Sequence, residues 1–286
     1  MDTAAGLGYE CVEAACWPQG KAERRYAGVS HIDVDNDSRE YVNHIHETCK
    51  KTGVEISALA YYPNTMDGDF QKREAAIRHL KKVIAFSEKL GVGMVTTFVG
   101  RDQTKSVEEN LEAFGRIWPP IIRYAEEHGV RIAIENCPML FGREQWPGGN
   151  NLFTSPALWR KMFDMIPSKN FGINYDPSHF VWQMMDYIQP IYEFRERIFH
   201  VHYKDIKVYP QKLKDVGIMA YPLEYMEPKL PGLGDVDWGR YVSALTDIGY
   251  DGFTCVEVED RAFEADRERI LDSLKLSKRY IEQFVI

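Results

Sequence analysis

The sequence lacks the cysteine patterns that stabilise secreted proteins or build short metal motifs. Its five cysteines form an odd set without a CxxC pair, which favours free thiols in a reducing compartment over a disulfide framework. The N-terminus has no basic segment followed by an apolar run, and no apolar stretch approaches the roughly 20 residues that span a bilayer. We therefore expect a cytoplasmic protein with no membrane partner.

Positive charge is also scarce. Lysine and arginine number 35 against 43 aspartates and glutamates, for a net charge of -8. A nucleic-acid surface needs clustered cations to neutralise phosphates, so this balance argues against a nucleic-acid partner. With 286 residues, of which 44% are hydrophobic, the chain can bury a large core. Because α/β barrels of about 250 residues commonly form one domain, we expect a single domain over residues 1–286.

Short apolar, β-branched runs alternate with longer amphipathic stretches. This alternation is typical of parallel strands joined by crossover helices. Helical patterns cover residues 71–90 and 107–128, for example. The strand candidates number seven: 9–16, 54–62, 92–100, 131–136, 171–176, 198–205 and 253–260.

Several helices are expected to end at a glycine that leads into the next strand, namely Gly91, Gly129 and Gly249. The fold class is therefore α/β, specifically a (β/α)8 TIM barrel, although seven strands are one fewer than a closed barrel requires. Residues 2–8 look like the end of a first helix. We therefore expect that the first strand is missing from this chain and that the natural N-terminus lies upstream of Met1. The alternative is an imperfectly closed barrel with an open strand edge.

Two irregular stretches follow predicted strands, at about 137–156 and 206–238. The first is rich in Gly, Asn and Pro, and the second contains four prolines. Loops after barrel strands lie on the face where active sites form, so both are candidate substrate loops. Plain surface excursions are the alternative.

Four polar residues interrupt the ends of strands that should be apolar: Glu135, Asp176, His202 and Glu257. Singly, each has a structural explanation, such as capping the next helix. Together they indicate a bound cation, since unpaired carboxylates are costly to bury. Three carboxylates and one imidazole suit one divalent ion, manganese first, with Mg²⁺, Co²⁺ or Zn²⁺ as alternatives.

The segments IEN (134–136), NYDPSH (174–179), HVHYKD (200–205) and the stretch 231–260 resemble the xylose isomerase-like barrel superfamily, in particular its sugar phosphate isomerase/epimerase group (the AP endonuclease 2-like barrel). The resemblance implies that Glu135, Asp176, His202 and Glu257 are the metal ligands. It also implies that the two glutamates are the catalytic acid and base, and that His179 contacts substrate.

Two positions depart from the ketose 3-epimerases within that superfamily. Those enzymes carry a substrate-binding Glu and Arg where this chain has Phe141 and Val208. The departure argues against a simple free-ketose 3-epimerase. Together with the long stretch 206–238, it suggests a larger or differently shaped substrate, such as a glycoside or an oxidised sugar.

Four further residues are candidates for substrate binding, each with a structural alternative. His200 and Lys204 share the facing of His202, but an interior hydrogen-bonded histidine and an ion pair explain them equally well. Glu13 can bind substrate or form an interior ion pair, and Trp17 can stack on a sugar or pack in the core. Glu259 lies on the same side of its strand as Glu257, so Glu259 is the alternative candidate for the last metal ligand.

The leading hypothesis is a metal-dependent sugar isomerase or epimerase of carbohydrate metabolism, which abstracts a proton beside a ketone and forms an enediolate. The main alternative is a lyase on the same site, such as a keto-inositol dehydratase or a 3-keto glycoside eliminase. An endonuclease IV-like hydrolase or a partner-dependent subunit ranks lower. No Gly-rich phosphate loop is evident, so we expect an unphosphorylated small-molecule sugar substrate. The resemblance alone implies a homo-oligomer.

Overall fold

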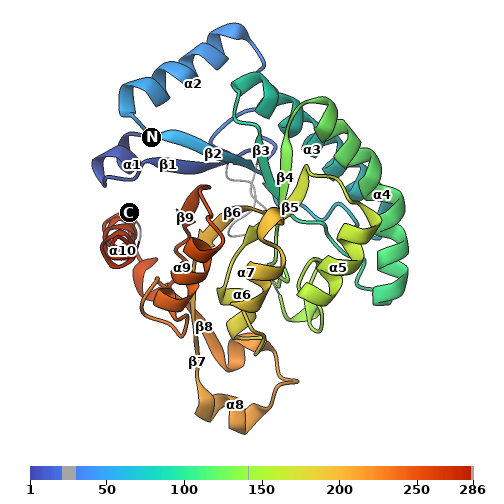
Figure 1. The fold of residues 1–286 in the computed structure, drawn as a ribbon, viewed down its shortest axis with the longest axis vertical. Coiled ribbons are helices and arrows are strands. Elements are labelled where there is room, and N and C mark those ends of the chain that lie inside the picture. The colour runs from blue at the N-terminus through green and yellow to red at the C-terminus, as the bar shows by residue number, and fades with distance from the viewer. Residues whose placement is uncertain (21–29, 141, 285–286) are drawn as a thin grey trace. The chain divides into compact units, whose positions relative to one another are not determined.

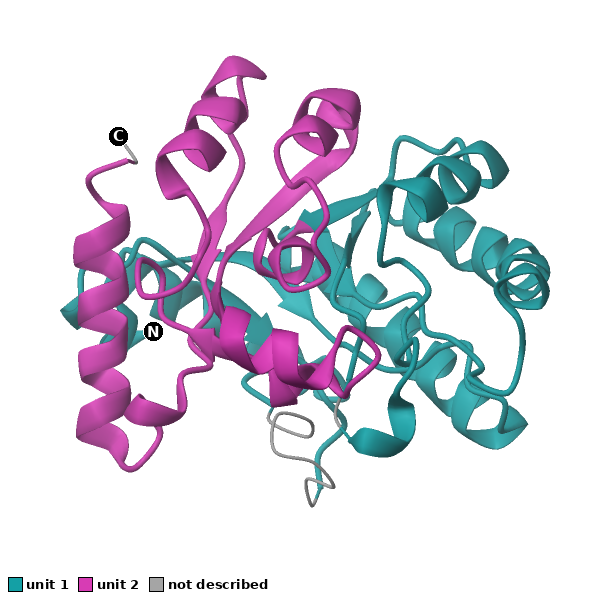
Figure 2. Cartoon of the chain, turned by 90° about the horizontal axis from the view of Figure 1, so that it is seen from below, with its two compact units in different colours: residues 1–174 teal, residues 175–286 magenta. Residues whose placement is uncertain are grey.

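The fold is an α/β arrangement built on a parallel sheet. A computed structural model describes residues 1–20, 30–140 and 142–284. Its main sheet has seven strands in the order β1-β2-β3-β4-β5-β6-β9, and a separate pair comprises β7 and β8 (Figure 1). The chain divides into two compact units, residues 1–174 and 175–286 (Figure 2).

The first unit alternates strands and helices as the sequence pattern predicts. Neighbouring strands pair in parallel from β1 to β5. Its elements are α1 (Asp2–Gly6), β1 (Cys11–Ala15), α2 (Arg39–Thr52), β2 (Glu55–Ala60), α3 (Phe70–Leu90), β3 (Met94–Thr97), α4 (Val107–Glu127), β4 (Arg131–Glu135), the 3-10 helix η1 (Arg143–Gln145), α5 (Pro156–Met165) and β5 (Phe171–Tyr175).

Local sequence signals begin and end these helices. Ser106 and Glu109 form a capping box at the start of α4, which satisfies backbone N–H groups that have no partner within the helix. Gly91 follows α3 with φ 70° and Gly129 follows α4 with φ 64°. Both are left-handed conformations that glycine adopts without a Cβ penalty. The predicted glycine turns are therefore confirmed.

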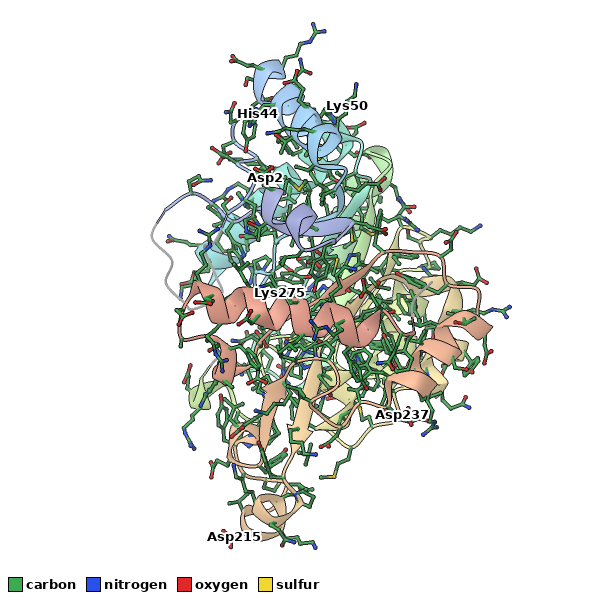
Figure 3. The ribbon with its side chains drawn as sticks, turned by 90° about the vertical axis from the view of Figure 1, so that its left-hand side faces the viewer. Asp2, His44, Lys50, Asp215, Asp237 and Lys275 are labelled. Carbon is green, nitrogen blue, oxygen red and sulfur yellow. The ribbon has the colours of Figure 1, made fainter. Side chains whose placement is uncertain are left out.

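The second unit begins at the end of β5. Its helix α9 begins after Asp237, which is labelled in Figure 3. The side chain of Asp237 accepts a hydrogen bond from the backbone N–H of Arg240. Its elements are α6 (Ser178–Val181), α7 (Gln189–Glu193), η2 (Arg195–Arg197), β6 (Ile198–Tyr203), β7 (Asp205–Val208), α8 (Pro210–Val216), η3 (Pro222–Glu224), β8 (Met226–Lys229), α9 (Trp238–Asp247), β9 (Thr254–Val256), η4 (Arg261–Phe263) and α10 (Arg267–Ile281).

The stretch 206–238 is more ordered than the sequence predicts. Its flanks β7 and β8 form an antiparallel pair, with α8 and η3 in the connection between them. The strand predicted over 198–205 ends at Tyr203, and Asp205 already belongs to β7. A two-stranded ribbon tolerates proline, because each of its strands is an edge strand. Pro228 in β8 therefore does not interrupt the hydrogen bonds of a central strand.

A single buried carboxylate organises the chain around this ribbon. Asp205 accepts hydrogen bonds from the backbone N–H groups of Ile206, Gly232 and Val236 and from the indole of Trp238, at 2.8 to 3.1 Å. Burial raises the pKa of Asp205, and these hydrogen bonds oppose that shift. Gly234 passes so close that a Cβ there would lie 2.1 Å from Asp205 Oδ1.

None of the helices within the described ranges combines the length and apolar character needed to cross a membrane. The longest, α3 and α4, have 21 residues each, and both carry charged residues along their length.

Replacing Gly234 with alanine should destabilise the second unit, because the added methyl group collides with Asp205 and with the carbonyl oxygen of Ile206. We expect urea denaturation to show a loss of about 1 to 3 kcal/mol, typical of overpacking. The matched control is Gly239→Ala in α9, where no atom lies closer than 3.7 Å. This variant should be unchanged or up to about 1 kcal/mol more stable. Equal stability of both variants would show that Asp205 does not constrain this loop.

Candidate metal centre

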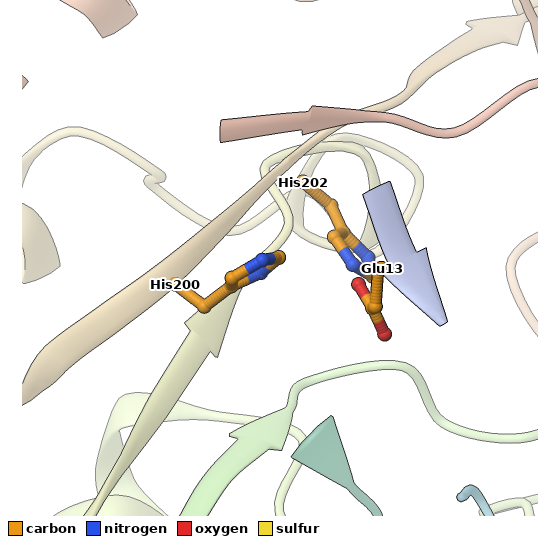
Figure 4. Close-up of side chains that lie close together, drawn as sticks. All are labelled: Glu13, His200 and His202. Atoms are coloured by element: carbon orange, nitrogen blue, oxygen red, sulfur yellow. The ribbon is translucent and has the colours of Figure 1, made fainter. Parts of the chain in front are cut away.

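Two neighbouring strands of the second unit carry a row of polar side chains. β6 and β9 pair in parallel, with His202 opposite Cys255. Side chains two residues apart share one face of a strand, and Figure 4 shows His200 and His202 projecting from β6 to the same side. Both rings are buried, at 0% and 4% exposed.

The contacts between these strands advance in steps of two residues. His200 Nε2 lies 3.6 Å from Cys255 Sγ, and His202 Nδ1 lies 3.2 Å from Glu257 Oε2. Lys204 Nζ then lies 3.3 Å from Glu257 Oε1 and 2.7 Å from Glu259 Oε2. Glu257 is thus the glutamate that faces His202, whereas Glu259 faces Lys204.

A buried aspartate follows β5 in the same unit. Asp176 is fully buried, and its Oδ1 accepts a hydrogen bond of 2.8 Å from the backbone N–H of Ser178. Its Oδ2 lies 3.2 Å from His179 Nε2. The indole N–H of Trp182 points at His179 Nδ1 from 3.5 Å. His179 therefore lies beside the carboxylate of Asp176.

Three of the predicted ligands converge within this unit. One ligand atom each of Asp176, His202 and Glu257 lies within 4.8 Å of the other two. The carboxylates of the buried Asp176 and the half-buried Glu257 repel one another, and a cation between them would remove that cost. Oxygen ligands with one imidazole nitrogen fit Mn²⁺, Mg²⁺, Co²⁺ or Zn²⁺. The residues present therefore fit a divalent metal ion.

The fourth predicted ligand, Glu135, belongs to the first unit. It is the last residue of β4 and is 4% exposed. Asn151 fixes the chain around it by donating hydrogen bonds to the carbonyl oxygens of Glu135 and Cys137, at 3.0 and 2.7 Å. Its metal coordination remains a prediction.

A polar cluster that the sequence did not reveal surrounds Glu13 in the first unit. Glu13 Oε1 accepts hydrogen bonds from Tyr62 Oη at 2.5 Å and from Thr96 Oγ1 at 2.7 Å. Tyr62 Oη in turn accepts a hydrogen bond from Asn174 Nδ2 at 3.2 Å. Burial, followed by the charges of Glu13 and Glu135, holds the pKa of Tyr62 well above its usual range, so the phenol stays protonated and donates.

Three further positions bear on substrate binding in the sequence analysis, namely Trp17, Val208 and Phe141. Trp17 is half-buried and packs edge-on against Tyr61, with 4.9 Å between ring centroids, so core packing accounts for part of its surface. Val208 lies at the end of β7, opposite Met226, in a ribbon rather than in an open loop. Phe141 lies outside the described residues.

Comparison with known proteins places these features in context. A family model described as xylose isomerase-like TIM barrel matches residues 1–280. An inosose dehydratase from Lactiplantibacillus plantarum is 24% identical over 228 residues, which cover 77% of this chain and 72% of that protein. The resemblance and the TIM-barrel fold class inferred from the sequence are both confirmed.

Two solved structures illustrate the likeness in fold. The IOLI protein with a bound zinc atom matches with a TM-score of 0.71 at 17% identity, covering 99% of this chain and 91% of that one. D-psicose 3-epimerase from Clostridium cellulolyticum, solved with D-tagatose, matches with a TM-score of 0.68 at 15% identity, covering 99% and 91% of the two chains.

Replacing Lys204 with methionine should destabilise the metal-free protein. The change leaves Glu257 and Glu259 facing one another without the ammonium that both contact. We expect a loss of roughly 1 to 3 kcal/mol in urea denaturation with chelator present. The double variant Lys204→Met/Glu259→Gln should recover part of this loss, because it also removes one of the two negative charges. A double variant less stable than the single one would contradict this electrostatic explanation.

Proposed function

Because the chain belongs to the xylose isomerase-like TIM barrel family, we propose that it is a divalent-metal-dependent sugar isomerase or epimerase. The proposed reaction removes a proton from a carbon beside a ketone and returns it through an enediolate. The convergence of Asp176, His202 and Glu257 at the ends of their strands supports this proposal most strongly. A carboxylate with a purely structural role would not need a second carboxylate and an imidazole beside it.

The proposed site uses Glu135, Asp176, His202 and Glu257 to hold one metal ion, with manganese as the first candidate. When bound, the ion stabilises the negative charge that develops on the carbonyl oxygen as the neighbouring proton leaves. The names of two similar proteins agree with this chemistry, since one is an inosose dehydratase and the other a D-psicose 3-epimerase.

Glu257 and Glu135 are the proposed acid and base. A carboxylate that removes a proton from carbon must be ionised and must lie within hydrogen-bond reach of that proton. Lys204 favours the ionised carboxylate of Glu257, because its ammonium lies 3.3 Å from Oε1. If one glutamate takes the proton from one face of the substrate and the other returns it to the opposite face, the carbon is epimerised.

The remaining polar residues are proposed to bind the hydroxyl groups of the substrate. His179 and His200 offer ring nitrogens, Lys204 offers an ammonium, and Glu13 offers a carboxylate already oriented by Tyr62 and Thr96. Trp17 is proposed to provide an aromatic surface for the apolar face of a sugar ring. Such a set of donors and acceptors suits a polyhydroxylated ligand.

A lyase is the second candidate, because the relative from Lactiplantibacillus plantarum is named an inosose dehydratase. The same proton abstraction leads to elimination when a hydroxyl or glycosidic oxygen sits beside the enolate. An unsaturated product, or a released aglycone, distinguishes elimination from epimerisation.

We expect the metal-loaded protein to exchange deuterium from solvent into a keto-sugar or a 3-keto glycoside, at a carbon beside the ketone. Glu135→Gln and Glu257→Gln should each lower the exchange rate by about 10²-fold or more, because glutamine cannot accept the proton. NMR of a substrate panel measures this rate.

The matched control is Glu259→Gln, which makes the same charge change on the same segment but alters a side chain that faces Lys204 instead of His202. It should retain most of the exchange. Deuterium exchange that persists in both Glu135→Gln and Glu257→Gln would contradict the assignment of these residues as acid and base.

A further inference from the structure

A partly buried cation, Arg101, lies beyond the end of β3. Arg101 is four residues past Thr97, the last residue of that strand. Its backbone is fixed by Asn64, which accepts a hydrogen bond from the Arg101 N–H at 2.9 Å and donates one to its carbonyl oxygen at 2.8 Å. The base of this side chain is therefore held in one position.

The guanidinium group of Arg101 is only partly satisfied. One terminal nitrogen donates a hydrogen bond of 3.1 Å to the carbonyl oxygen of Gly148. A Cβ on Gly148 would lie 2.2 Å from that nitrogen, so the cation packs directly against bare backbone. Nε is buried and has no hydrogen-bond acceptor, and within residues 1–20, 30–140 and 142–284 no carboxylate forms an ion pair with Arg101.

This arrangement is costly without a further ligand. Burial lowers the pKa of Arg101, which reflects the free energy spent on removing the cation from water. An N–H group left without an acceptor adds to that cost. A planar guanidinium matches the two oxygens of a carboxylate or phosphate, which pair with it through parallel hydrogen bonds.

The position of Arg101 relates it to the proposed reaction. β3 pairs with β4 so that Thr97 lies opposite Ile134, the residue before Glu135. Arg101 continues from β3 past this level, at the same end of the strands and within the same unit as Glu135. Arg101 and Glu135 therefore follow neighbouring strands at the same end of the sheet.

We infer that Arg101 binds an oxyanion of the substrate, a carboxylate or a phosphate, so that the natural substrate is an acidic sugar derivative. This inference deepens the proposed function in naming the substrate class, but binding of the anion does not require turnover. Its success or failure is therefore measured separately from proton exchange.

A purely structural role for Arg101 is the competing explanation. Its hydrogen bond to Gly148 ties down the segment that follows η1. Gln103 ties down the same segment, since its side-chain amide donates hydrogen bonds to the carbonyl oxygens of Gln145 and Gly149, at 2.6 and 2.9 Å. Gln103→Leu therefore loosens the segment without removing a charge, and provides a matched control.

Calorimetric titration of the metal-loaded protein tests the inference with D-glucuronate, D-glucose and inorganic phosphate as probes. We expect at least one of the two oxyanions to bind about tenfold or more tightly than glucose. Arg101→Gln, which keeps a neutral donor for the Gly148 carbonyl, should abolish that preference, whereas Gln103→Leu should retain it. Selective binding of glucuronate identifies a carboxylate, and selective binding of phosphate identifies a phosphorylated sugar.

Two results would overturn the inference. One is wild-type protein that binds neither oxyanion more tightly than glucose, a comparison that needs no variant to fold. The other is an oxyanion preference that survives in Arg101→Gln, which would assign the anion to the metal centre instead. Proton exchange measured on neutral keto-sugars reports on the proposed function independently of either result.

Discussion

The repulsion between two carboxylates that meet at the ends of parallel strands is the constraint on which this site depends. Asp176 is fully buried and Glu257 is half-buried, and both reach the same small region as the imidazole of His202. The strands β5, β6 and β9 bring these side chains together because each ends at the same edge of the sheet. A cation between these carboxylates would relieve their repulsion, and oxygen ligands with one imidazole suit a divalent metal ion.

The residues around the proposed ligands contact these carboxylates or fix the chain next to them. His179 Nε2 lies 3.2 Å from one oxygen of Asp176, and Lys204 contacts both Glu257 and Glu259. Asp205 comes next in the chain and collects four hydrogen-bond donors, which fixes the start of the β7–β8 ribbon and the approach to α9. The segment from His200 to Asp205 thus combines proposed metal ligation, charge compensation and loop anchoring.

Much of the fold was predictable from the sequence, because parallel strands buried on both faces are continuous apolar runs and their helices end at glycine. All seven strand candidates correspond to strands of the main sheet, although β9 is only Thr254–Val256. The ribbon of β7 and β8 was not predicted, since its prolines resemble loop sequence and its pairing joins residues about twenty positions apart. Asp205 orders this stretch through hydrogen bonds to residues about 30 positions away, and such long-range contacts leave no local pattern in the sequence.

The site was predictable only where a residue type contradicts its strand. A charged residue at the end of an apolar run stands out, which is how Glu135, Asp176, His202 and Glu257 were identified. Tyr62, Thr96 and Asn174 carry no sequence signal, and only the fold shows that Tyr62 and Thr96 bind Glu13 while Asn174 binds Tyr62. Arg101 gave no signal because an arginine in a loop is usually solvated.

Metal titration of the chelator-treated protein tests the central claim most directly. We predict that one divalent ion binds per chain, and that Asp176→Asn weakens its affinity by about tenfold or more, since a neutral amide replaces a buried carboxylate ligand. Asp164→Asn, which makes the same change at an exposed position of α5, should bind as the native chain does. A folded native protein that binds no divalent ion, or an Asp176→Asn variant with unchanged affinity, would contradict the account.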